Sequence, residues 1–278
     1  MIATAVRSRA KAALRWIGGR RLLVGFTGRY LCARIVMEWP VFFAREVLRP
    51  SGVRYYHLRE SGLQVALRHA ALDAATLTEI FYQYEYRPHP DVASKIGDPK
   101  SIVDLGANVG LFGVFASSYW PRSTIVGYEA DPDNVAVHEL AIGANALQDR
   151  WRVIACAAGA SDGEVELANG RAMRSFVVED DTDPGVPTIH VPVRDVLADV
   201  CAADLVKIDI EGGEWAILLD PRFVDSPPRA LVVEYHPHLC PEVDPRGAAE
   251  RALLAAGMTI YPAWHRPEGY GMLWAWRA

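Results

Sequence analysis

Apolar residues recur along the chain in short runs that alternate with longer amphipathic stretches. From Ser101 onward the runs are typical of buried strands, and the stretches between them have helical spacing. This alternation predicts an α/β domain whose mostly parallel sheet is covered by helices on both faces. Seven strands are predicted, the last two as an antiparallel edge pair, over residues 102–105, 124–129, 151–156, 205–210, 230–235, 258–263 and 269–276.

Turn-forming residues mark the ends of several of these elements. Asp131 and Asp244 are each followed by a proline, which combines a capping carboxylate with a residue suited to the first helical position. Gly257 is a natural helix stop. Residues 163–178 and 188–193 are predicted as short, partly irregular strands on either side of an acidic loop.

The first hundred residues have a different pattern. Residues 53–58 and 63–67 are strand-like, and a serine-glycine pair between them suits a tight hairpin turn. A helix is predicted over residues 73–84, ended by the prolines at 88 and 90. The chain therefore divides into a basic helical N-terminal extension, a hairpin and helix leading into the core, and the α/β domain, over residues 1–52, 53–100 and 101–278.

Charge is distributed unevenly along the chain. The net charge is −5, but residues 1–54 hold eleven Arg or Lys against two Glu, a balance of +9, which leaves −14 for the rest. An acidic domain without a basic face argues against nucleic acid as a partner. The basic segment is predicted to be a solvated helical extension, a lid or a homodimer contact, or alternatively to touch an anionic surface such as a membrane.

Cysteine usage and hydropathy bear on the compartment. Cys32, Cys156, Cys201 and Cys240 have neither metal-ligand spacing nor a dense disulfide pattern, which predicts reduced thiols. No apolar run approaches the ~18 residues that span a bilayer, and residues 22–26 are too short for a signal-peptide core. The expectation is a cytoplasmic protein that is soluble or attached peripherally to the membrane.

Residues 101–113 place a glycine turn between a buried strand and a helix. Such a turn brings backbone N–H groups and a helix N-terminus close to a ligand. Its glycines lie at offsets 0, 4 and 7, whereas a dinucleotide fingerprint has them at 0, 2 and 5. The spacing, with Asp104 before the turn, resembles the S-adenosylmethionine (SAM) site of Rossmann-like methyltransferases. An ordinary strand-to-helix turn is the alternative.

Predicted cofactor contacts follow the ends of the first three strands, where ligands bind in open α/β sheets. Asp104 would hold the cationic amino-acid end of SAM, and Glu129, 19 residues after Gly110, would accept both ribose hydroxyls. A solvent-exposed strand end is the alternative for Glu129. The other predicted contacts come from the turn, from backbone beside the adenine and from a carboxylate on its amine: Gly106, Ala107, Asn108, Gly110, Ala157 and Asp162.

Charged residues cluster after the fourth and fifth strands. Lys207, Asp209 and Glu211 alternate with isoleucines and fall on one side of the fourth strand. Three charges at a buried strand end are costly unless they pair, bind a ligand or meet a metal. Glu234 and His236 leave the neighbouring strand close by, and a histidine beside carboxylates suits a general base.

Taken with the glycine turn, these segments resemble the FkbM family of SAM-dependent O-methyltransferases. The block Lys207-Ile-Asp-Ile-Glu-Gly212 is the most specific part, and the resemblance covers roughly residues 53–276. One departure is Val193-Arg-Asp195, where the family usually has Thr-Leu-Asp. The matching segments are 103–110, 128–134, 206–214 and 233–236, with a further likeness at 84–86.

The resemblance implies a Rossmann-like class I methyltransferase fold and methyl transfer from SAM to a hydroxyl of a sugar, glycolipid or polyketide-type metabolite. His236 would be the catalytic base. Glu234, Asp209 or Glu211 would orient it or the hydroxyl, and Asp209 would also reach the cofactor. An alternative mechanism places Mg²⁺ on Asp209, Glu211 and Glu234, because oxygen ligands suit a hard cation.

Two other classes of function stay open. A SAM-binding module without catalysis would keep the acidic strand ends as a paired structural cluster. An enzyme for NAD or a nucleotide sugar is disfavoured by the glycine spacing. No motif identifies the acceptor, and its selection is assigned to the N-terminal segment and to residues 170–187.

Overall fold

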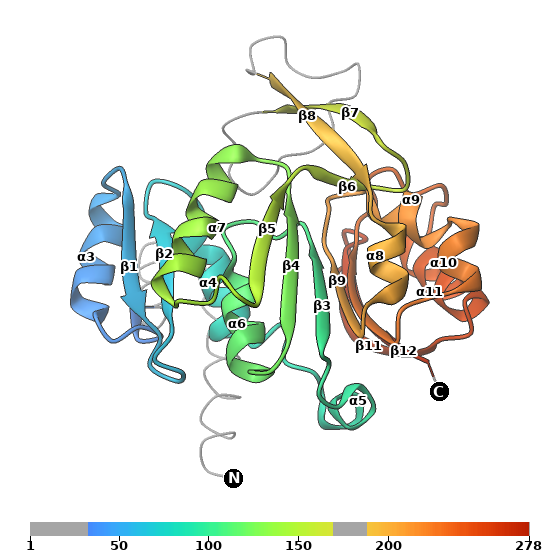
Figure 1. Ribbon diagram of the computed structural model, residues 1–278, viewed down its shortest axis with the longest axis horizontal. Helices are drawn as coiled ribbons and strands as arrows, with labels where there is room; N and C mark the ends of the chain where they lie inside the picture. Colours follow the sequence, from blue (N-terminus) through green and yellow to red (C-terminus); the bar gives the residue numbers. More distant parts are fainter. Residues whose placement is uncertain (1–32, 169–187, 278) are drawn as a thin grey trace.

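The computed structural model of the protein describes residues 33–168 and 188–277 (Figure 1). Its helices are α3 (Trp39–Leu48), α4 (Asp73–Phe81), α5 (Pro90–Ile96), α6 (Leu111–Tyr119), α7 (Pro132–Ala144), α8 (Leu197–Ala202), α9 (Glu214–Leu218), α10 (Pro221–Asp225) and α11 (Pro245–Ala255). Its strands are β1 (Val53–His57), β2 (Gln64–Arg68), β3 (Ser101–Leu105), β4 (Thr124–Glu129), β5 (Trp151–Ala155), β6 (Ala157–Gly159), β7 (Gly163–Ala168), β8 (Thr188–Asp195), β9 (Leu205–Ile208), β10 (Ala230–Tyr235), β11 (Thr259–His265) and β12 (Gly271–Trp276). Several predictions fall outside the described residues. They are the helical pattern of residues 1–32, the reduced thiol of Cys32, and the acidic loop and the role in acceptor selection assigned to residues 170–187.

A seven-stranded sheet forms the centre of the molecule (Figure 1). Its strand order is β11-β12-β10-β9-β3-β4-β5, and β12 runs antiparallel to both of its neighbours while the other pairs are parallel. The chain leaves β3 toward β4 and later leaves β9 toward β10, so the strand order reverses between β3 and β9. Ligands bind at such a switch, beyond the carboxyl ends of the strands. The predicted sheet and its antiparallel edge pair are confirmed.

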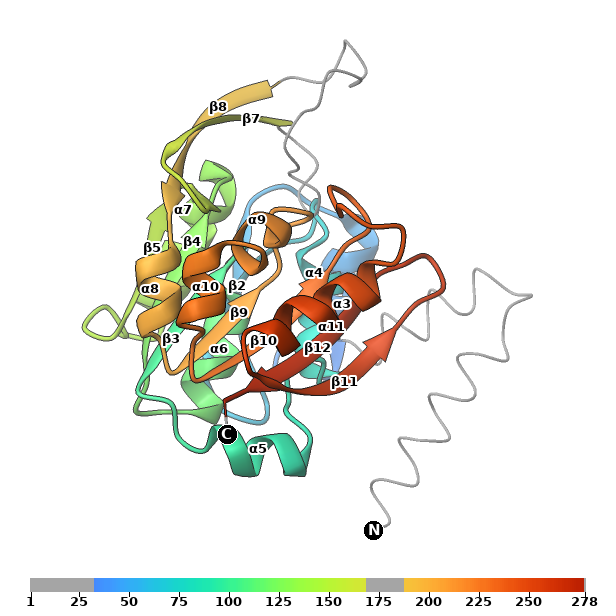
Figure 2. The ribbon, with the colours of Figure 1, turned by 90° about the vertical axis from the view of Figure 1, so that its right-hand side faces the viewer.

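Alternating side chains of the sheet enter two separate cores. Ile102 and Val232 face the core that α4 to α7 complete, whereas the adjacent Val103 and Val233 face the core completed by α8 to α11. The second helical layer, with α8, α10 and α11, is seen against the sheet in Figure 2. Helices therefore cover both faces, as predicted, which explains why the central strands are apolar on both sides.

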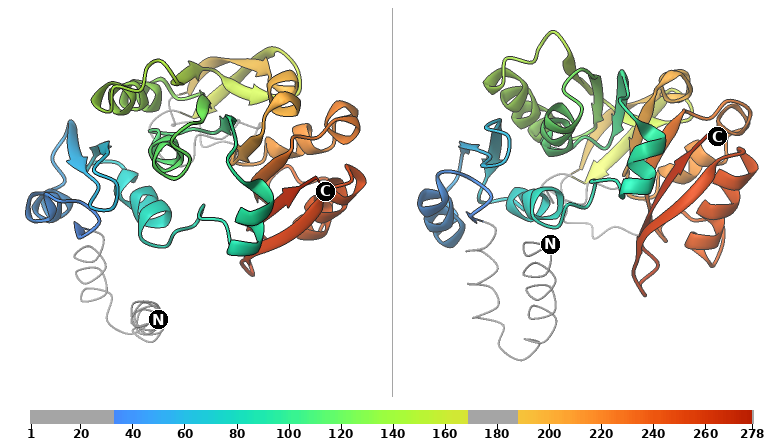
Figure 3. Two further views of the ribbon diagram at one scale, coloured as in Figure 1. Left: turned by 60° about the horizontal axis from the view of Figure 1, so that its bottom comes forward. Right: turned by 90° about the horizontal axis from the view of Figure 1, so that it is seen from below.

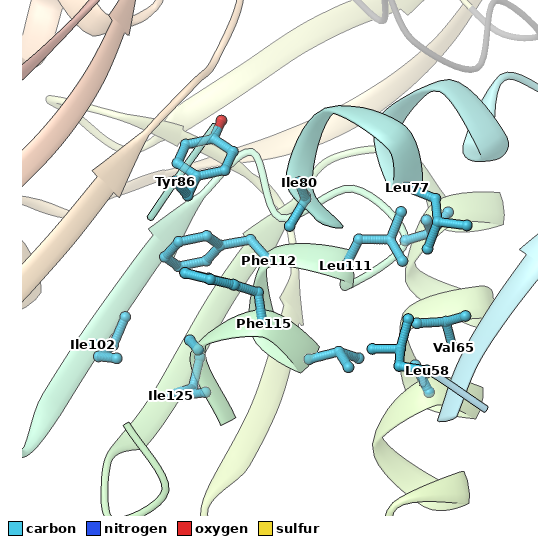
Figure 4. Close-up of a cluster of buried hydrophobic side chains, with 14 of the residues drawn as sticks. Leu58, Val65, Leu77, Ile80, Tyr86, Ile102, Leu111, Phe112, Phe115 and Ile125 are labelled. Carbon is cyan, nitrogen blue, oxygen red and sulfur yellow. The ribbon is translucent and has the colours of Figure 1, made fainter. Parts of the chain in front are cut away.

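The N-terminal part of the described chain forms an added layer beside α6 and α7. Strands β1 and β2 pair antiparallel as predicted, and α3 contributes the fully buried Phe42 to the same core. Leu77 and Ile80 of α4 pack beside Leu111 and Phe112 of α6 (Figure 4). Figure 3 shows this layer at the opposite end of the molecule from β11 and β12.

Three elements, α4, α5 and β6, differ from the predicted pattern. Helix α4 ends at Phe81, well before the prolines, and the chain then turns at Tyr84, which has a left-handed φ of +57°. Pro90 does not end that helix but begins α5, since a proline needs no N–H partner in the first turn. Residues 157–159, directly after the third predicted strand, form a separate strand, β6, which pairs with β8 in a three-stranded sheet.

Two further findings concern hydropathy and thiols. Within residues 33–168 and 188–277, no helix combines the length and apolar character needed to cross a membrane. Cys156, Cys201 and Cys240 are free thiols, in agreement with the prediction for these three positions.

Candidate active site

Two cavities open at the carboxyl edge of the central sheet, on either side of the loop after β3. The β10-side cavity has a volume of about 160 Å³ and the β4-side cavity about 150 Å³. Gly106, Asn108, Asp209 and Glu211 line both cavities, so the two meet at the glycine turn. Among the predicted site residues, those that also line one cavity or the other are Ala107, Glu129, Ala157, Glu234 and His236.

The glycines of the turn are required by backbone conformation and by close packing. Gly106 and Gly110 have φ of +75° and +82°, values that favour glycine. A Cβ at Gly106 would collide with the carbonyl oxygen of Asp209, and one at Gly110 would lie 2.8 Å from the ring of His138. The turn is therefore pressed against its neighbours on one side while Gly106 lines the cavities on the other.

The N–H groups of the turn are already bonded within the protein. Those of Gly106 and Ala107 donate to the carbonyl oxygen of Tyr128, and that of Gly110 donates to Ala107. The N–H of Asn108 donates to Glu129 at 2.7 Å. The expectation that this turn brings free N–H groups to a ligand was wrong, because those of Gly106, Ala107 and Asn108 join the turn to the end of β4 and that of Gly110 donates within the turn.

Glu129 lies at the end of β4 and lines the β4-side cavity. Its carboxylate accepts hydrogen bonds from the N–H groups of Asn108 (2.7 Å) and Asp131 (2.9 Å) and from the amide of Asn134 (3.2 Å). Burial raises the pKa of Glu129, and these hydrogen bonds oppose the rise. The side chain is 7% exposed, so it is a fixed acceptor on the cavity wall and not a solvated strand end.

Three predicted cofactor contacts lie away from the cavity walls. Asp104 is fully buried and its carboxylate faces Lys207, whose Nζ is 3.2 Å away. Gly110 packs against His138. Asp162 accepts a hydrogen bond from the N–H of Asp195, which holds the loop after β6. None of the three belongs to the lining of the two cavities described above.

Lys207 joins the strand ends beneath the turn. Its ammonium group donates to the carbonyl oxygen of Gly106 at 2.7 Å and lies 3.5 Å from Asp209. Burial alone would lower the pKa of Lys207, but the charges of Asp104 and Asp209 outweigh it and the pKa is raised. Lys207 is therefore a permanent cation that neutralises Asp104 and fixes the position of the turn.

His236 is held by Glu214, the last residue of the matching segment 206–214, for which the sequence predicted no role. Glu214 is fully buried at the start of α9 and accepts from the N–H of His236 at 2.7 Å and from its Nδ1 at 3.0 Å. The second oxygen of Glu214 accepts from the N–H of Gly212 at 2.8 Å. The carboxylate that fixes Nδ1 therefore comes from the next helix, and the prediction that Asp209, Glu211 or Glu234 orients the ring or the acceptor hydroxyl stays a prediction for the Nε2 side.

The other ring nitrogen of His236 faces three carboxylates. Its Nε2 lies 3.7 Å from Glu211, 3.9 Å from Asp209 and 4.0 Å from Glu234. Burial opposes protonation of the ring, but the hydrogen bond to Glu214 and the surrounding negative charges outweigh it and raise the pKa of His236 to about 9. At neutral pH the ring therefore carries a proton on both nitrogens. Burial and Asp209 raise the pKa of Glu234 to about 9, although the charge of His236 opposes this.

The far wall of the β10-side cavity comes from the N-terminal layer, which the sequence did not connect to the site. Glu79, Glu85, Tyr86 and Ile80 all line it. The Tyr86 hydroxyl donates to Asp209 at 3.3 Å, and Figure 4 shows it pointing away from the buried cluster around Phe112. Burial and neighbouring carboxylates raise the pKa of Glu85 to about 7. The only available signal was the likeness at residues 84–86, which gave no role.

The side chains give no support to the Mg²⁺ alternative. Across the described residues, no three His, Cys, Asp or Glu side chains are grouped so that they could hold a metal ion. Asp209, Glu211 and Glu234 instead surround His236, and Asp209 is also bonded to Tyr86 and paired with Lys207.

The sheet order and the site together define the class of protein. This doubly wound sheet with its antiparallel seventh strand is the Rossmann-like fold of class I SAM-dependent methyltransferases. Residues 104–257, more than half of the chain, match the family model of the methyltransferase FkbM domain. The protein therefore belongs to the FkbM methyltransferase family, and it is a methyltransferase.

Solved structures similar to this chain share little of its sequence. Precorrin-6y C5,15-methyltransferase from Geobacter metallireducens GS-15 has 14% identity and a TM-score of 0.41, over 67% of this chain and 87% of its own. Human methyltransferase 10 domain containing protein has 13% identity and a TM-score of 0.46, over 79% of this chain and 90% of its own. TYW2 from P. horikoshii, solved in complex with MeSAdo, has 11% identity and a TM-score of 0.42, over 82% of this chain and 73% of its own. No curated protein matches the sequence.

Proposed function

We propose that the protein is a SAM-dependent O-methyltransferase that acts on a hydroxyl of a sugar, glycolipid or polyketide-type acceptor. The observation that carries the proposal is the buried Glu214–His236 pair on the wall of the β10-side cavity, next to the glycine turn. A histidine whose Nδ1 is fixed by a carboxylate presents its Nε2 to whatever occupies the cavity.

Two observations favour SAM over a dinucleotide. The N–H groups of residues 106–110 are bonded internally, so the turn has no donors left to cradle a pyrophosphate. The β10-side cavity is lined by the carboxylates of Glu79, Glu85, Asp209, Glu211 and Glu234. The carboxylates of Asp209 and Glu211 line both cavities and can pair with the sulfonium and ammonium groups of SAM, although Lys207, Arg266 and His236 offset part of the negative charge.

The residues present fit SAM in a definite orientation. Glu129 and Ala157, on the β4-side cavity, would hold the ribose and the adenine, and Asp209 would hold the cationic amino-acid end near Gly106. Asp104 would not contact SAM directly. It pairs with Lys207, and Lys207 donates to the carbonyl oxygen of Gly106 in the turn.

SAM supplies the methyl group on a positively charged sulfur. The protein holds the acceptor oxygen in line with that group, which accounts for most of the gain in rate. We assign His236 Nε2 as the group that takes the proton of the acceptor hydroxyl. The resting ring is protonated, so it first loses that proton to solvent, which becomes favourable when a cationic donor shares the negative charge of the carboxylates near the ring.

The decisive experiment measures transfer of a labelled methyl group from SAM to small molecules of a deproteinised extract. The proposal predicts a labelled product whose methyl group survives mild alkali, as an ether does and an ester does not. His236→Gln should lower the transfer rate about 10²- to 10⁴-fold while SAM still binds. His238→Gln is the matched control, since the carbonyl of His238 and not its ring accepts from Trp215.

Each outcome has a defined meaning. Calorimetry that detects NAD binding but no SAM binding would overturn the proposal. Tight SAM binding without transfer to any extract component would favour a binding module without catalysis. Retention of full activity in EDTA is expected, and its loss would restore the metal mechanism.

A further inference from the structure

We propose that Arg68, in the N-terminal layer, is a positioning residue for the cofactor: through Asn134 it fixes the carboxylate of Glu129 against the ribose. The inference rests on the proposed use of SAM. It concerns a residue outside the segment 104–257 that matches the family model.

A continuous chain of hydrogen bonds links the two residues. The Nη2 of Arg68 donates to Oδ1 of Asn134 at 2.6 Å, and Nδ2 of Asn134 donates to Oε1 of Glu129 at 3.2 Å. Asn134 is 4% exposed and itself lines the β4-side cavity. Because the amide oxygen of Asn134 is occupied by Arg68, its NH₂ group is turned toward Glu129.

Arg68 is itself held rigidly. Its Nε and Nη2 both donate to the carboxylate of Asp73, each at 3.0 Å, and Asp73 also accepts from the backbone N–H of Arg68 at 2.8 Å. Asp73 is 2% exposed at the start of α4. Because two nitrogens of the planar guanidinium are bound to Asp73, the group is held in one orientation. The Nη2 donor is therefore already directed toward Asn134.

Both ends of strand β2 are bonded to helix α7. At the first residue, Gln64 exchanges backbone hydrogen bonds with the side chain of Asn145, which follows α7. At the last residue, Arg68 reaches Asn134 in the first turn of the same helix. The first turn of α7 also supplies the capping residue Asp131, whose N–H donates to Glu129. The layer thus fixes the helix end on which the ribose-binding carboxylate depends.

The consequence for binding is specific. Glu129 has to present its free lone pairs to two ribose hydroxyls, and hydrogen bonds to a charged group are sensitive to direction. If the amide of Asn134 is released, Glu129 loses one of three partners and gains rotational freedom. Affinity for the nucleoside should then fall, although no atom of Arg68 touches it.

The test is calorimetric titration of the full chain with SAM and with S-adenosylhomocysteine. Arg68→Lys keeps the charge next to Asp73, but one ammonium group lacks the fork that reaches both Asp73 and Asn134. We expect affinity for both ligands to fall roughly three- to tenfold, in line with the loss of one ordinary hydrogen bond. Arg150→Lys is the matched control, because Arg150 donates to the carbonyl of Ser123 at the opposite edge of the sheet and should leave affinity unchanged.

A double-mutant cycle separates positioning from general destabilisation. Asn134→Leu should weaken binding as Arg68→Lys does, and the double variant should bind no worse than Asn134→Leu alone, since both changes break one chain of contacts. Additive losses, or unchanged affinity in Arg68→Lys, would overturn the inference while leaving SAM binding by the wild type intact. Failure of the wild type to bind SAM would instead overturn the proposed function.

Discussion

Four carboxyl groups from three segments of the chain surround the ring of His236. Glu214 holds one ring nitrogen, and Asp209, Glu211 and Glu234 lie within 4.0 Å of the other. The hydrogen bond to Glu214 and the charges of Glu214, Asp209 and Glu211 make this histidine an imidazolium at neutral pH, unlike an isolated histidine whose pKa is near 6.5. At the scale of the residue, catalysis therefore depends on what reduces that negative charge when a methyl donor is present.

A cationic ligand should release the proton. SAM and S-adenosylhomocysteine differ by one methyl group and one positive charge, and a unit charge about 5 Å away at an effective dielectric of ~20 shifts a pKa by roughly two units. From a resting pKa of about 9, SAM binding at pH 8 should release close to one proton more than S-adenosylhomocysteine does. Calorimetry in buffers of different ionisation enthalpy measures the difference. His236→Gln should abolish it, and equal release by both ligands in the wild type would contradict the electrostatic account.

At the scale of elements, the glycine turn between β3 and α6 shows how a motif serves packing as well as binding. Three of its N–H groups, those of residues 106–108, bond to the end of β4, and Gly110 lies against the ring of His138 on α7. The cavity is thus shaped by three elements that meet at the turn. A substitution in the turn should therefore lower the free energy of unfolding.

Gly110→Ala should destabilise the fold more than an alanine at another left-handed glycine. Gly257 is the matched control: its φ of +72° is similar to the +82° of Gly110, but nothing lies within 4 Å of its missing Cβ. Gly257→Ala should cost about 1 kcal/mol of unfolding free energy for the conformation alone. Gly110→Ala should cost a further ~1–3 kcal/mol for the overlap with His138. Urea denaturation measures both, and equal losses would show that His138 moves aside freely.

At the scale of the whole molecule, the N-terminal layer and the sheet share the charged cavity, so the site contributes to folding stability. The raised pKa of His236 favours the folded state below the ordinary histidine value, and that contribution is lost as the pH rises through about 9. Glu234 and Glu85, whose pKa values are raised to about 9 and about 7, act in the same direction, because folding holds them protonated.

Stability should therefore fall between pH 6.5 and 9. The difference between the pKa of His236 in the folded state and its ordinary value allows a loss of up to about 3 kcal/mol of unfolding free energy over this range. Melting temperatures measured across it should decline in the wild type and decline less in His236→Gln. A wild-type profile that is flat or rises toward pH 9 would contradict the assigned protonation states.

Much of the fold could be read from local pattern. Apolar strands, aspartate-proline helix starts and the glycine turn are short-range signals, and parallel strands bring their carboxyl ends to one edge. Glu129, Asp209, Glu234 and His236 were therefore placed at the cavities by their positions at strand ends. Pro90 was misread because a proline that ends one helix and a proline that begins the next look alike in sequence.

The sequence by itself determined the sheet, the edge at which ligands gather and the residue types found there, because each depends on spacing along the chain. Only the tertiary structure decided which partner fixes which group. Glu214 reaches His236 across 22 positions, and Arg68 reaches Asn134 across 66. Such pairs are set by how helices and the hairpin pack on the sheet, and no local period records that packing.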